Sequence, residues 1–551
     1  MGGDAELVPA GGAVGGAARR GRDGAGGAGA RERPRSGGGA AEDPAPLQNW
    51  GLPMVALVVG AFMALMDSSI VNVAIPTMEH VFGVNTSQVE WVVTIYLLAL
   101  GVVVPASGWL GDRLGFKRLY LYSLLLFVVG SGLCAVSWSL PVLIGARVIQ
   151  ALGGGMIMPT TMSMVYRLIP RDKLGVASGF FGMSMLLAPA IGPTLGGYLV
   201  EYVDWRWIFT VNLPIGVIGL VLATSVLPEF RARDAGPFDN WGFFTSAGGL
   251  FALLLALSEG STWGWSSEGV TWLVFASGVL LIAFVWVELS LERPLLDLRV
   301  FRYGSFTASI LFVVGLNVAL FAGAFFIPVY LQLVRNMGAL QTGLILMPGA
   351  LATGVMMPIA GRIYDRAGPV PSVLAGTAIL TLGTYLLHAM SLTTGPGAIV
   401  WWMVIRGLGM GMAMMPATTA GMSVIPPALV GRASALNNIV MRVAGSFGIA
   451  VLTVVLDNGV ISHSVALGAQ YLPGTVRGLA LQQAVARAGS AAPTALAQLI
   501  GYVQGLAFTR SMDGLFVSLA LVSAISVIPV FFLHKAGEPA GEVPRPGPVM
   551  E

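Results

Sequence analysis

A carboxylate stands near the middle of a long apolar segment of this sequence. Asp67 lies within residues 52–78, where most other side chains are hydrophobic. An acid at the centre of a membrane helix costs about 2.5–3.5 kcal/mol on insertion scales. Removal from water also disfavours the charged form, so the group can be neutral in one environment and charged in another. Asp67 is therefore expected to carry protons or to hold a cation.

Three arginines also lie inside apolar segments. An unpaired arginine at such a depth is costly, so it needs a partner or a water-filled cavity. Arg147 lies at a depth comparable to that of Asp67, so it is a candidate for a functional role. The alternative is a structural role, in which it only bonds backbone carbonyl groups between packed helices. For Arg406 a structural role and a functional one are equally open. Arg442 is the third, and its mechanism does not follow from the sequence.

These residues need membrane helices to position them. Of the 551 residues, 55% are hydrophobic and only 10% are charged, too few to cover the surface of a soluble protein. Runs of about 20 apolar residues, the length that crosses a bilayer, recur along the chain. We therefore predict an all-α integral membrane protein. Its fourteen helices lie near 52–78, 89–110, 119–138, 140–166, 174–200, 208–227, 241–259, 270–288, 304–333, 342–361, 372–390, 398–424, 434–456 and 511–534.

Basic residues in the short loops indicate the orientation. One side holds most of them, for example Arg113, Lys117 and Arg118 after the second segment, whereas the short loops of the other side offer only Arg206 and Arg335. The positive-inside rule then predicts a multi-pass protein of the cell membrane, plasma or inner, with both termini in the cytoplasm. The small basic excess reports this topology, and it does not indicate nucleic-acid binding.

The chain contains an internal repeat. Residues 108–115 read Gly-Trp-Leu-Gly-Asp-Arg-Leu-Gly, and residues 361–368 read Gly-Arg-Ile-Tyr-Asp-Arg-Ala-Gly. Arg147 and Arg406 each precede a stretch rich in Gly and Met. The matching residues lie about 250 positions apart and have the same polarity relative to the membrane. This pattern predicts a parallel repeat of two six-helix halves, with residues 241–288 as an inserted pair of helices between them.

The predicted organisation has five parts. The first residues are rich in Gly, Ala, Arg and Glu and should be disordered, and no secretory signal peptide is expected. A long connection near the C-terminus should form short amphipathic helices with a structural role. The parts are a cytoplasmic tail at 1–49, an N-terminal half at 50–228, the inserted pair with its linkers at 229–303, a C-terminal half at 304–535 with an outward-facing loop at 457–510, and a cytoplasmic tail at 536–551.

Three strings carry a resemblance to a known family. Residues 65–76 read Leu-Met-Asp-Ser-Ser-Ile-Val-Asn-Val-Ala-Ile-Pro, with Ser69 where Thr is usual. Residues 204–216 read Asp-Trp-Arg-Trp-Ile-Phe-Thr-Val-Asn-Leu-Pro-Ile-Gly, and residues 294–302 read Pro-Leu-Leu-Asp-Leu-Arg-Val-Phe-Arg. Over about residues 50–535 the chain resembles the major facilitator superfamily, and within it the fourteen-helix drug:proton antiporter branch of the EmrB/QacA type. The resemblance links Arg147 to proton movement.

The repeated loops are candidates for a gate. Asp112 can meet a positive helix N-terminus or an arginine of the facing half, and so hold one side of the protein closed. The alternative is a plain turn that only sets topology. The resemblance implies a gating role for a set of residues in the two loops. They are Gly108, Asp112, Arg113, Gly115, Arg118, Asp365 and Arg366.

The fifth segment is dense in proline and glycine, with Pro189, Gly192, Pro193, Gly196 and Gly197. Proline bends a helix and glycine allows close helix contact. The resemblance associates this element with antiporters, and hence with export. A kinked packing helix without this function is the alternative.

Methionines gather in the fourth and twelfth segments. Their flexible, polarizable side chains suit a pocket that accepts varied hydrophobic molecules, although most of them must be ordinary packing. The candidates for such a cavity are Met158, Met162, Met414, Arg406 and Arg442.

No cofactor or metal site is expected. The chain has no nucleotide-binding loop, which excludes ATP as the energy source and leaves the proton gradient. Cys134 is the only cysteine, and His80, His388, His463 and His534 are scattered without the spacing of metal ligands.

We predict a secondary active transporter that exports hydrophobic or amphipathic compounds, such as drugs, antibiotics or a natural product, in exchange for protons by alternating access. Its partners would be a small substrate, protons and the lipid bilayer, without nucleic acid. Some drug exporters of the branch that the chain resembles carry a further acid in the tenth helix. Residues 342–361 contain none, so the resemblance does not imply a strict preference for dicationic drugs. The alternative is a proton-coupled uptake symporter for a nutrient. An enzyme or receptor on such a scaffold lacks a catalytic constellation.

Overall fold

The computed structural model describes residues 49–230, 236–471, 475–488 and 492–533. Over these ranges the regular structure is entirely helical, and fourteen helical stretches are long and apolar enough to cross a membrane. The predicted all-α fold and its fourteen spans are confirmed. The described residues all belong to one compact unit. Apart from Asn49, the predicted tails at 1–49 and 536–551 lie outside the described residues.

The first six spans follow one another closely. Short helical turns prolong several of them. The elements are α1 (Gly51–Ile70), η1 (Val71–Ala74) and α2 (Ile75–Phe82) in the first span; α3 (Thr86–Val89), α4 (Trp91–Val103), η2 (Val104–Ala106) and α5 (Ser107–Leu114) in the second; then α6 (Phe116–Ala135), α7 (Leu140–Leu168), η3 (Arg171–Lys173), α8 (Leu174–Tyr202), α9 (Trp207–Thr210) and α10 (Asn212–Val226).

Two further helices precede the second set of six spans. The inserted pair is α11 (Asn240–Trp263) and α12 (Glu268–Ser290). The remaining elements are η4 (Leu298–Arg302), α13 (Gly304–Val329), η5 (Tyr330–Val334), α14 (Ala339–Ala367), α15 (Pro369–Leu386), η6 (Leu387–Ala389), α16 (Pro396–Ser423), η7 (Pro427–Leu429), α17 (Val430–Gly468), η8 (Ala469–Tyr471), α18 (Val476–Ala488), α19 (Ala492–Ile525) and η10 (Ile528–Phe532).

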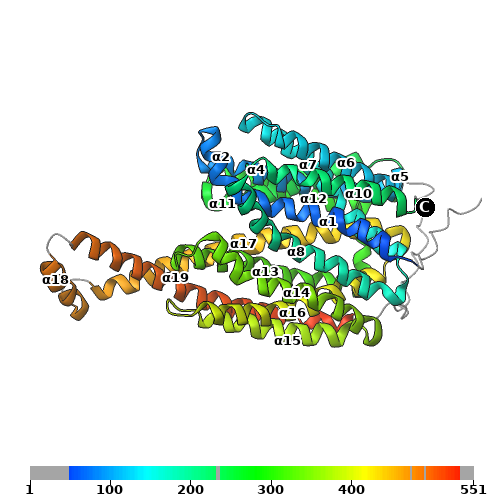
Figure 1. Cartoon of the computed structure of the whole chain (residues 1–551). Coiled ribbons are helices and arrows are strands. Elements are labelled where there is room, and N and C mark those ends of the chain that lie inside the picture. The colour runs from blue at the N-terminus through cyan, green and yellow to red at the C-terminus, as the bar shows by residue number, and fades with distance from the viewer. Residues whose placement is uncertain (1–48, 231–235, 472–474, 489–491, 534–551) are drawn as a thin grey trace, which may run out of the picture. The chain divides into compact units, whose positions relative to one another are not determined.

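Helix packing repeats between the two sets of six spans. Helix α6 packs along α7 as α15 packs along α16, and α1 packs on α8 as α13 packs on α17. The two sets meet where α8 packs on α14 and where α17 packs on α5 and α7. The inserted α11 packs on both α4 and α17, so it contacts both sets (Figure 1).

Prolines interrupt the helices near the polar positions. Pro76 lies in the first turn of α2, and the chain there passes from α1 through the 3₁₀ turn η1. Pro105 likewise lies in η2 between α4 and α5. Proline lacks an amide hydrogen and cannot continue the backbone ladder of the preceding turn. The first break begins four residues after Asp67.

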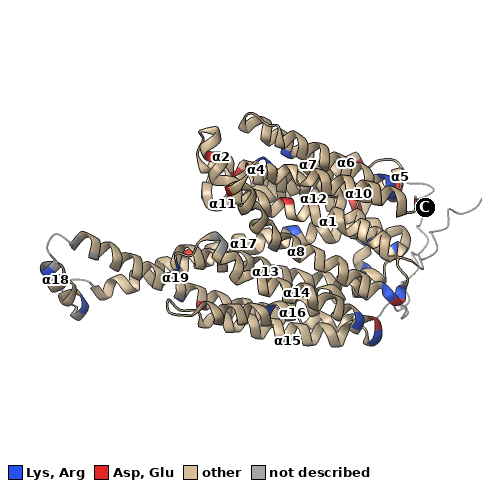
Figure 2. Cartoon of the chain, in the orientation of Figure 1, with Lys and Arg blue, Asp and Glu red and all other residues tan. Residues whose placement is uncertain are grey.

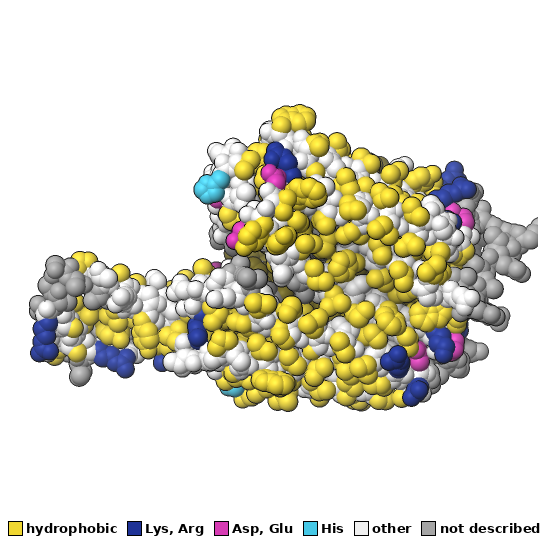
Figure 3. All heavy atoms as spheres, in the orientation of Figure 1, with side chains coloured by type: hydrophobic (Ala, Val, Ile, Leu, Met, Phe, Trp, Pro, Cys, Tyr) yellow, Lys and Arg dark blue, Asp and Glu magenta, His cyan; other side chains and the backbone are white. Residues whose placement is uncertain are grey.

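The surface fits a lipid environment. Hydrophobic side chains cover most of the face in Figure 3. On α12 the exposed hydrophobic side chains include Trp272, Phe275, Ile282 and Trp286. Basic residues gather at the helix ends around α5 (Figure 2). This is the end that the loop charges predict to be cytoplasmic.

The region predicted as loop 457–510 is largely helical. Helix α17 continues to Gly468 and α19 already begins at Ala492, and both extend beyond the ends of the other helices (Figure 1). Only α18 matches the expected short helix. The expected ends at 456 and 511 were wrong because Gly459 and Gly505 do not end the helices there. Helices α17 and α19 pack on each other in this region, where Ser511 lies beside Gly459 and within 3.4 Å of Nδ1 of His463, and this packing outweighs the low helix propensity of glycine.

Candidate functional site

Asp67 and Arg147 are in contact in the interior of the N-terminal half. Both side chains are fully buried, and the Nη1 of Arg147 on α7 donates to Oδ2 of Asp67 on α1 at 2.6 Å. The structure thus brings together the two residues that the sequence singled out for proton coupling. Two opposite charges in direct contact away from water interact much more strongly than a surface pair.

The second carboxylate oxygen of Asp67 has two amide donors. Nε2 of Gln150 and Nδ2 of Asn212 donate to Oδ1 at 2.8 and 2.7 Å. The same two amides donate to Oγ of Ser131 at 3.2 and 3.1 Å, and this hydroxyl donates in turn to the carbonyl of Phe209. Three donors from α7 and α10 therefore surround Asp67, an arrangement that suits its charged form.

Sequence reasoning did not assign these amide partners. Gln150 follows Arg147 by three positions, which places both on one face of α7. Asn212 lies inside the string 204–216, but its contact with Asp67 crosses 145 positions of the chain. The spacing from Arg147 was a usable signal for Gln150, whereas Asn212 required the folded structure.

Arg147 is held from other sides as well. Its Nε donates to the carbonyl of Val92 at 3.2 Å, and its guanidinium lies 3.9 Å from the ring centre of Tyr96. It thus pairs with Asp67 and also bonds a backbone carbonyl. A proton on Asp67 would remove the negative charge and leave Arg147 without its counter-ion.

The proline and glycine element of α8 packs against α1 beside Asp67. A side chain on Gly192 would collide with Oγ of Ser69, and one on Gly196 would lie 2.8 Å from the side chain of Ile70. Gly197 has more room, since the nearest atom to its Cβ position is 4.0 Å away. Pro189 and Pro193 lie on the exposed side of α8. Gly192 and Gly196 thus bring α8 next to the turn of α1 that carries Asp67.

The first repeated loop closes on the facing half. Asp112 is buried and forms an ion pair with Arg167 of its own half at 3.8 Å, and it also interacts electrostatically with Arg432 of α17. A side chain on Gly108 would lie 3.2 Å from the backbone of Arg432. The ion pair of Asp112 is thus with an arginine of its own half, and Arg432 of the facing half is an electrostatic neighbour.

The other residues of this loop shape its turn and its surface. Gly115 has φ +95°, a conformation that favours glycine, at the junction of α5 and α6. Arg113 is exposed, and Arg118 forms an ion pair with Glu229 at 3.5 Å.

The second repeated loop makes the contact with a helix N-terminus. The carboxylate of Asp365 on α14 accepts hydrogen bonds from the amides of Gly175 and Val176, at 2.8 and 3.1 Å, in the first turn of α8. The backbones of Gly175 and Gly361 are in contact. Arg366 beside it is exposed and has polar contacts of its own. The two halves are therefore closed on each other at this end.

The predicted cavity residues fall into three groups. Met158 and Met162 line a closed space of about 20 Å³ between the halves, together with Met415. Met414 is buried in the hydrophobic core instead. The remaining two candidates are arginines.

Arg406 and Arg442 differ in their surroundings. Nη2 of Arg406 donates to the carbonyl of Ala319 at 2.5 Å, which matches the structural role left open for it. Arg442 lines a separate cavity of about 460 Å³.

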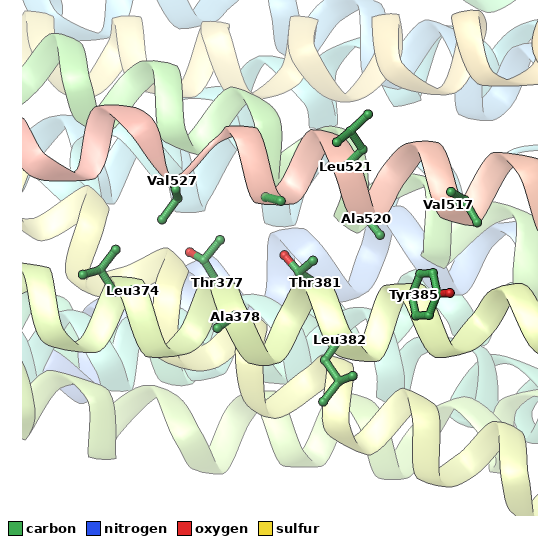
Figure 4. Close-up of a pocket in the computed structure, with 11 residues that line it drawn as sticks. Leu374, Thr377, Ala378, Thr381, Leu382, Tyr385, Val517, Ala520, Leu521 and Val527 are labelled. Carbon is green, nitrogen blue, oxygen red and sulfur yellow. The ribbon is translucent and has the colours of Figure 1, made fainter.

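An apolar groove of about 800 Å³ runs between α15 and α19. Thr377 and Thr381 of α15 point toward α19 in Figure 4. Leu382, Tyr385 and Leu521 at its edge are about half exposed, so the groove lies on the outer face of the helices. It is part of the surface that surrounding lipid would cover, and it is separate from Asp67.

Comparison with known proteins identifies the family. The model of the Major Facilitator Superfamily matches residues 57–449. The chain belongs to the Major Facilitator Superfamily. Membership makes it a membrane transporter and not an enzyme.

Two similar proteins whose names refer to drug resistance align with most of this chain. The "Multidrug resistance protein B homolog" of Mycobacterium tuberculosis (strain ATCC 25618 / H37Rv) is 36% identical over 405 residues, 72% of this chain and 75% of that protein. The "Lincomycin resistance protein LmrB" of Listeria monocytogenes serovar 1/2a is 30% identical over 409 residues, 74% and 87% of the two chains. The solved proton:xylose symporter XylE shares the fold, with a TM-score of 0.56 at 12% identity over 85% of this chain and 94% of XylE.

Proposed function

We propose that this transporter exports hydrophobic or amphipathic compounds, drugs or a natural product among them, in exchange for protons by alternating access. The observation that carries the proposal is the buried contact between Asp67 and Arg147. A protonatable group with a fixed counter-ion inside the membrane is the part that proton coupling needs. The drug-resistance names of two relatives support export as the direction.

Helix α8 connects the protonatable Asp67 to the contact between the two halves at Asp365. Asp67 lies on the stretch of α1 that packs on Gly192 of α8, and the first turn of α8 is held by Asp365 of the other half. A shift of α1 on protonation would therefore displace α8, whose first turn is hydrogen-bonded to Asp365. We call these hydrogen bonds from Gly175 and Val176 to Asp365 the latch. Only a step of a few kcal/mol can be driven this way, because a proton that moves down 100 mV supplies about 2.3 kcal/mol.

The latch has a matching strength. Asp365 accepts two hydrogen bonds, and a hydrogen bond to a charged group contributes about 1.5–3 kcal/mol. One proton and the release of this latch are thus of the same order. Protons from outside would neutralise Asp67 and favour opening to the cytoplasm, and substrate bound from the cytoplasm or inner leaflet would favour deprotonation.

The same argument proposes a location and an orientation. The basic residues around α5 lie at the end where the two halves are in contact, so we propose that this end and both termini lie in the cytoplasm. The membrane would be the plasma or inner membrane of the cell. The structure then corresponds to a state closed to the cytoplasm.

The test is transport in proteoliposomes with an imposed pH gradient. The substrates would be a panel of amphipathic compounds that includes lincomycin and anilinonaphthalene sulfonate. The wild-type protein should move at least one of them against the direction of proton flow, and Asp67→Asn should abolish the coupled movement. Undiminished coupled exchange in Asp67→Asn would contradict the proposal.

A matched control is Glu288→Gln. Glu288 is another buried carboxylate, on α12, where it accepts a hydrogen bond from the amide of Leu296. Its replacement should leave coupling intact.

Substrate movement in the same direction as the protons would establish the uptake symporter in place of the exporter.

A further inference from the structure

A cavity of about 460 Å³ lies between α4, α11, α13 and α17. It is formed by helices of both halves and by the first inserted helix. Its wall is mainly apolar, with Leu254 and Leu257 of α11 and Phe321 and Phe325 of α13. This volume is within the range of about 300–1,000 Å³ that is typical of sites for small organic molecules.

Arg442 is the one charged side chain in this wall. Its Nε is buried and has no hydrogen-bond partner among the described residues. Tyr96 is its electrostatic neighbour. The Arg442 side chain as a whole is only partly buried, because it borders the cavity. A cation inside the membrane with no anion beside it is costly, so the geometry leaves a demand for negative charge at this point.

The other two embedded arginines have acceptors that Arg442 lacks. Arg147 has Asp67 as its counter-ion, and Arg406 donates to the carbonyl groups of Ala319 and Leu320. One nitrogen of each of these two arginines is also without a hydrogen-bond partner in the part of the chain that the structure describes, so the difference is the acceptor that each of them has. Arg442 borders open space instead.

Two acids on the helices that form the wall do not take up the charge. Glu90 and Glu259 lie near the outer ends of the segments that contain α4 and α11, where they interact with each other, and neither belongs to the cavity wall. Among the described residues, the wall contains no carboxylate. Hydroxyl groups of Thr94 and Ser446 add hydrogen-bonding capacity near Arg442.

A glycine shapes the wall next to Arg442. Gly445 follows it by one helical turn, and a Cβ there would lie 2.6 Å from the ring of Phe321. The absent side chain lets this ring pack close to α17. The sequence string from Arg442 to Gly445 therefore places a cation and an aromatic surface side by side.

We propose that this cavity binds amphipathic organic anions. Arg442 would hold the anionic group, and the aromatic and aliphatic wall would hold the apolar part. The inference rests on the proposed export function and names the substrate class for it. An inside-negative potential drives an anion outward, so export of the anion is favourable by about 2.3 kcal/mol per charge and 100 mV. Exchange of one anion for one proton would then move two charges in the same electrical sense.

The test uses two fluorescent probes that differ in one group. Anilinonaphthalene sulfonate carries a sulfonate, and N-phenylnaphthylamine is its neutral counterpart. Arg442→Gln should weaken binding of the sulfonate probe to the full-length protein about tenfold or more, as expected for a lost hydrogen bond to a charged group. Binding of the neutral probe should not change, and Arg442→Lys should retain much of the affinity for the sulfonate.

Two controls keep the result specific. Arg477→Gln removes an exposed arginine of α18 that is far along the chain from the cavity, and it should change neither affinity. An equal loss of both probes in Arg442→Gln would assign a packing role to Arg442 and overturn the proposal. Unchanged binding of the sulfonate probe would also overturn it.

A lipid phosphate is the other source of the same chemistry. Binding is therefore compared in nanodiscs of phosphatidylcholine and of phosphatidylglycerol. Displacement of the sulfonate probe by phosphatidylglycerol, together with no transport of the probe, would make this a lipid site and overturn the proposal. The binding assay does not depend on export. If the protein exports lincomycin with protons but Arg442→Gln binds the sulfonate probe as the wild type does, only the anion site is refuted. If Arg442→Gln selectively loses the sulfonate probe but no compound is exported, only the export function is refuted.

Discussion

The contact between Asp67 and Arg147 makes a quantitative prediction about stability. Asp67→Asn keeps the size of the side chain but leaves the Arg147 cation buried without a counter-ion. Arg147→Met leaves the carboxylate with only its two amide donors. Breaking one side of a buried ion pair costs about 3–5 kcal/mol, whereas replacing both charges by neutral groups is often close to neutral. The double variant should therefore be destabilised by at least about 2 kcal/mol less than the sum of the two single variants.

The assay is a double-mutant cycle on the free energy of unfolding. Reversible unfolding in mixed micelles would be followed at neutral pH by the fluorescence of the 13 tryptophans. A parallel cycle of Asp67→Asn with Arg406→Met is the control, because Arg406 bonds carbonyls in the other half and should add independently. If the Asp67 and Arg147 variants add within about 0.5 kcal/mol, the contact contributes no coupling and the reasoning is refuted.

Two further predictions concern the helix contacts that transmit the proton's effect. Gly192→Ala should lower the free energy of unfolding by about 1–3 kcal/mol and impair transport, because α8 can then no longer approach α1. Gly197→Ala is the control and should be tolerated, since its Cβ position is free of close contacts. Equal effects of the two substitutions on unfolding and transport would contradict the packing argument. Asp365→Asn should weaken the latch and raise, by about tenfold, the labelling rate of a cysteine introduced by Met415→Cys in a Cys134→Ser background. An unchanged labelling rate would show that Asp365 does not hold this end closed.

Much of the fold could be predicted from the sequence because a bilayer leaves few choices. Apolar runs of the right length gave the fourteen spans, and only the ends of the last two were misplaced, where α17 and α19 continue past the bundle. Helix length outside the membrane is set by local propensity and packing, which hydropathy does not measure. The tails and the exact extent of the five predicted parts stay predictions.

The site was predictable only in part. The cost of a buried charge pointed to Asp67 and Arg147 separately, and the structure places them in contact. Gln150 and Asn212 were missed because an amide in a membrane helix is not costly enough to stand out. Asp112 was expected to meet either a helix N-terminus or an arginine of the facing half, and it is Asp365 of the other loop that accepts hydrogen bonds from a helix N-terminus. Which of two equivalent acids meets a helix end depends on how the halves pack, and the repeat alone does not reveal it.

The most direct test of the account is whether Asp67 carries the coupled proton. Purified protein in weakly buffered detergent solution would be mixed with a compound that the wild-type protein exports, and the released protons would be counted with a pH indicator. We expect the wild-type protein to release protons when it binds the compound, and Asp67→Asn to bind it without release. Equal proton release from Asp67→Asn would show that another group carries the proton and would contradict the account.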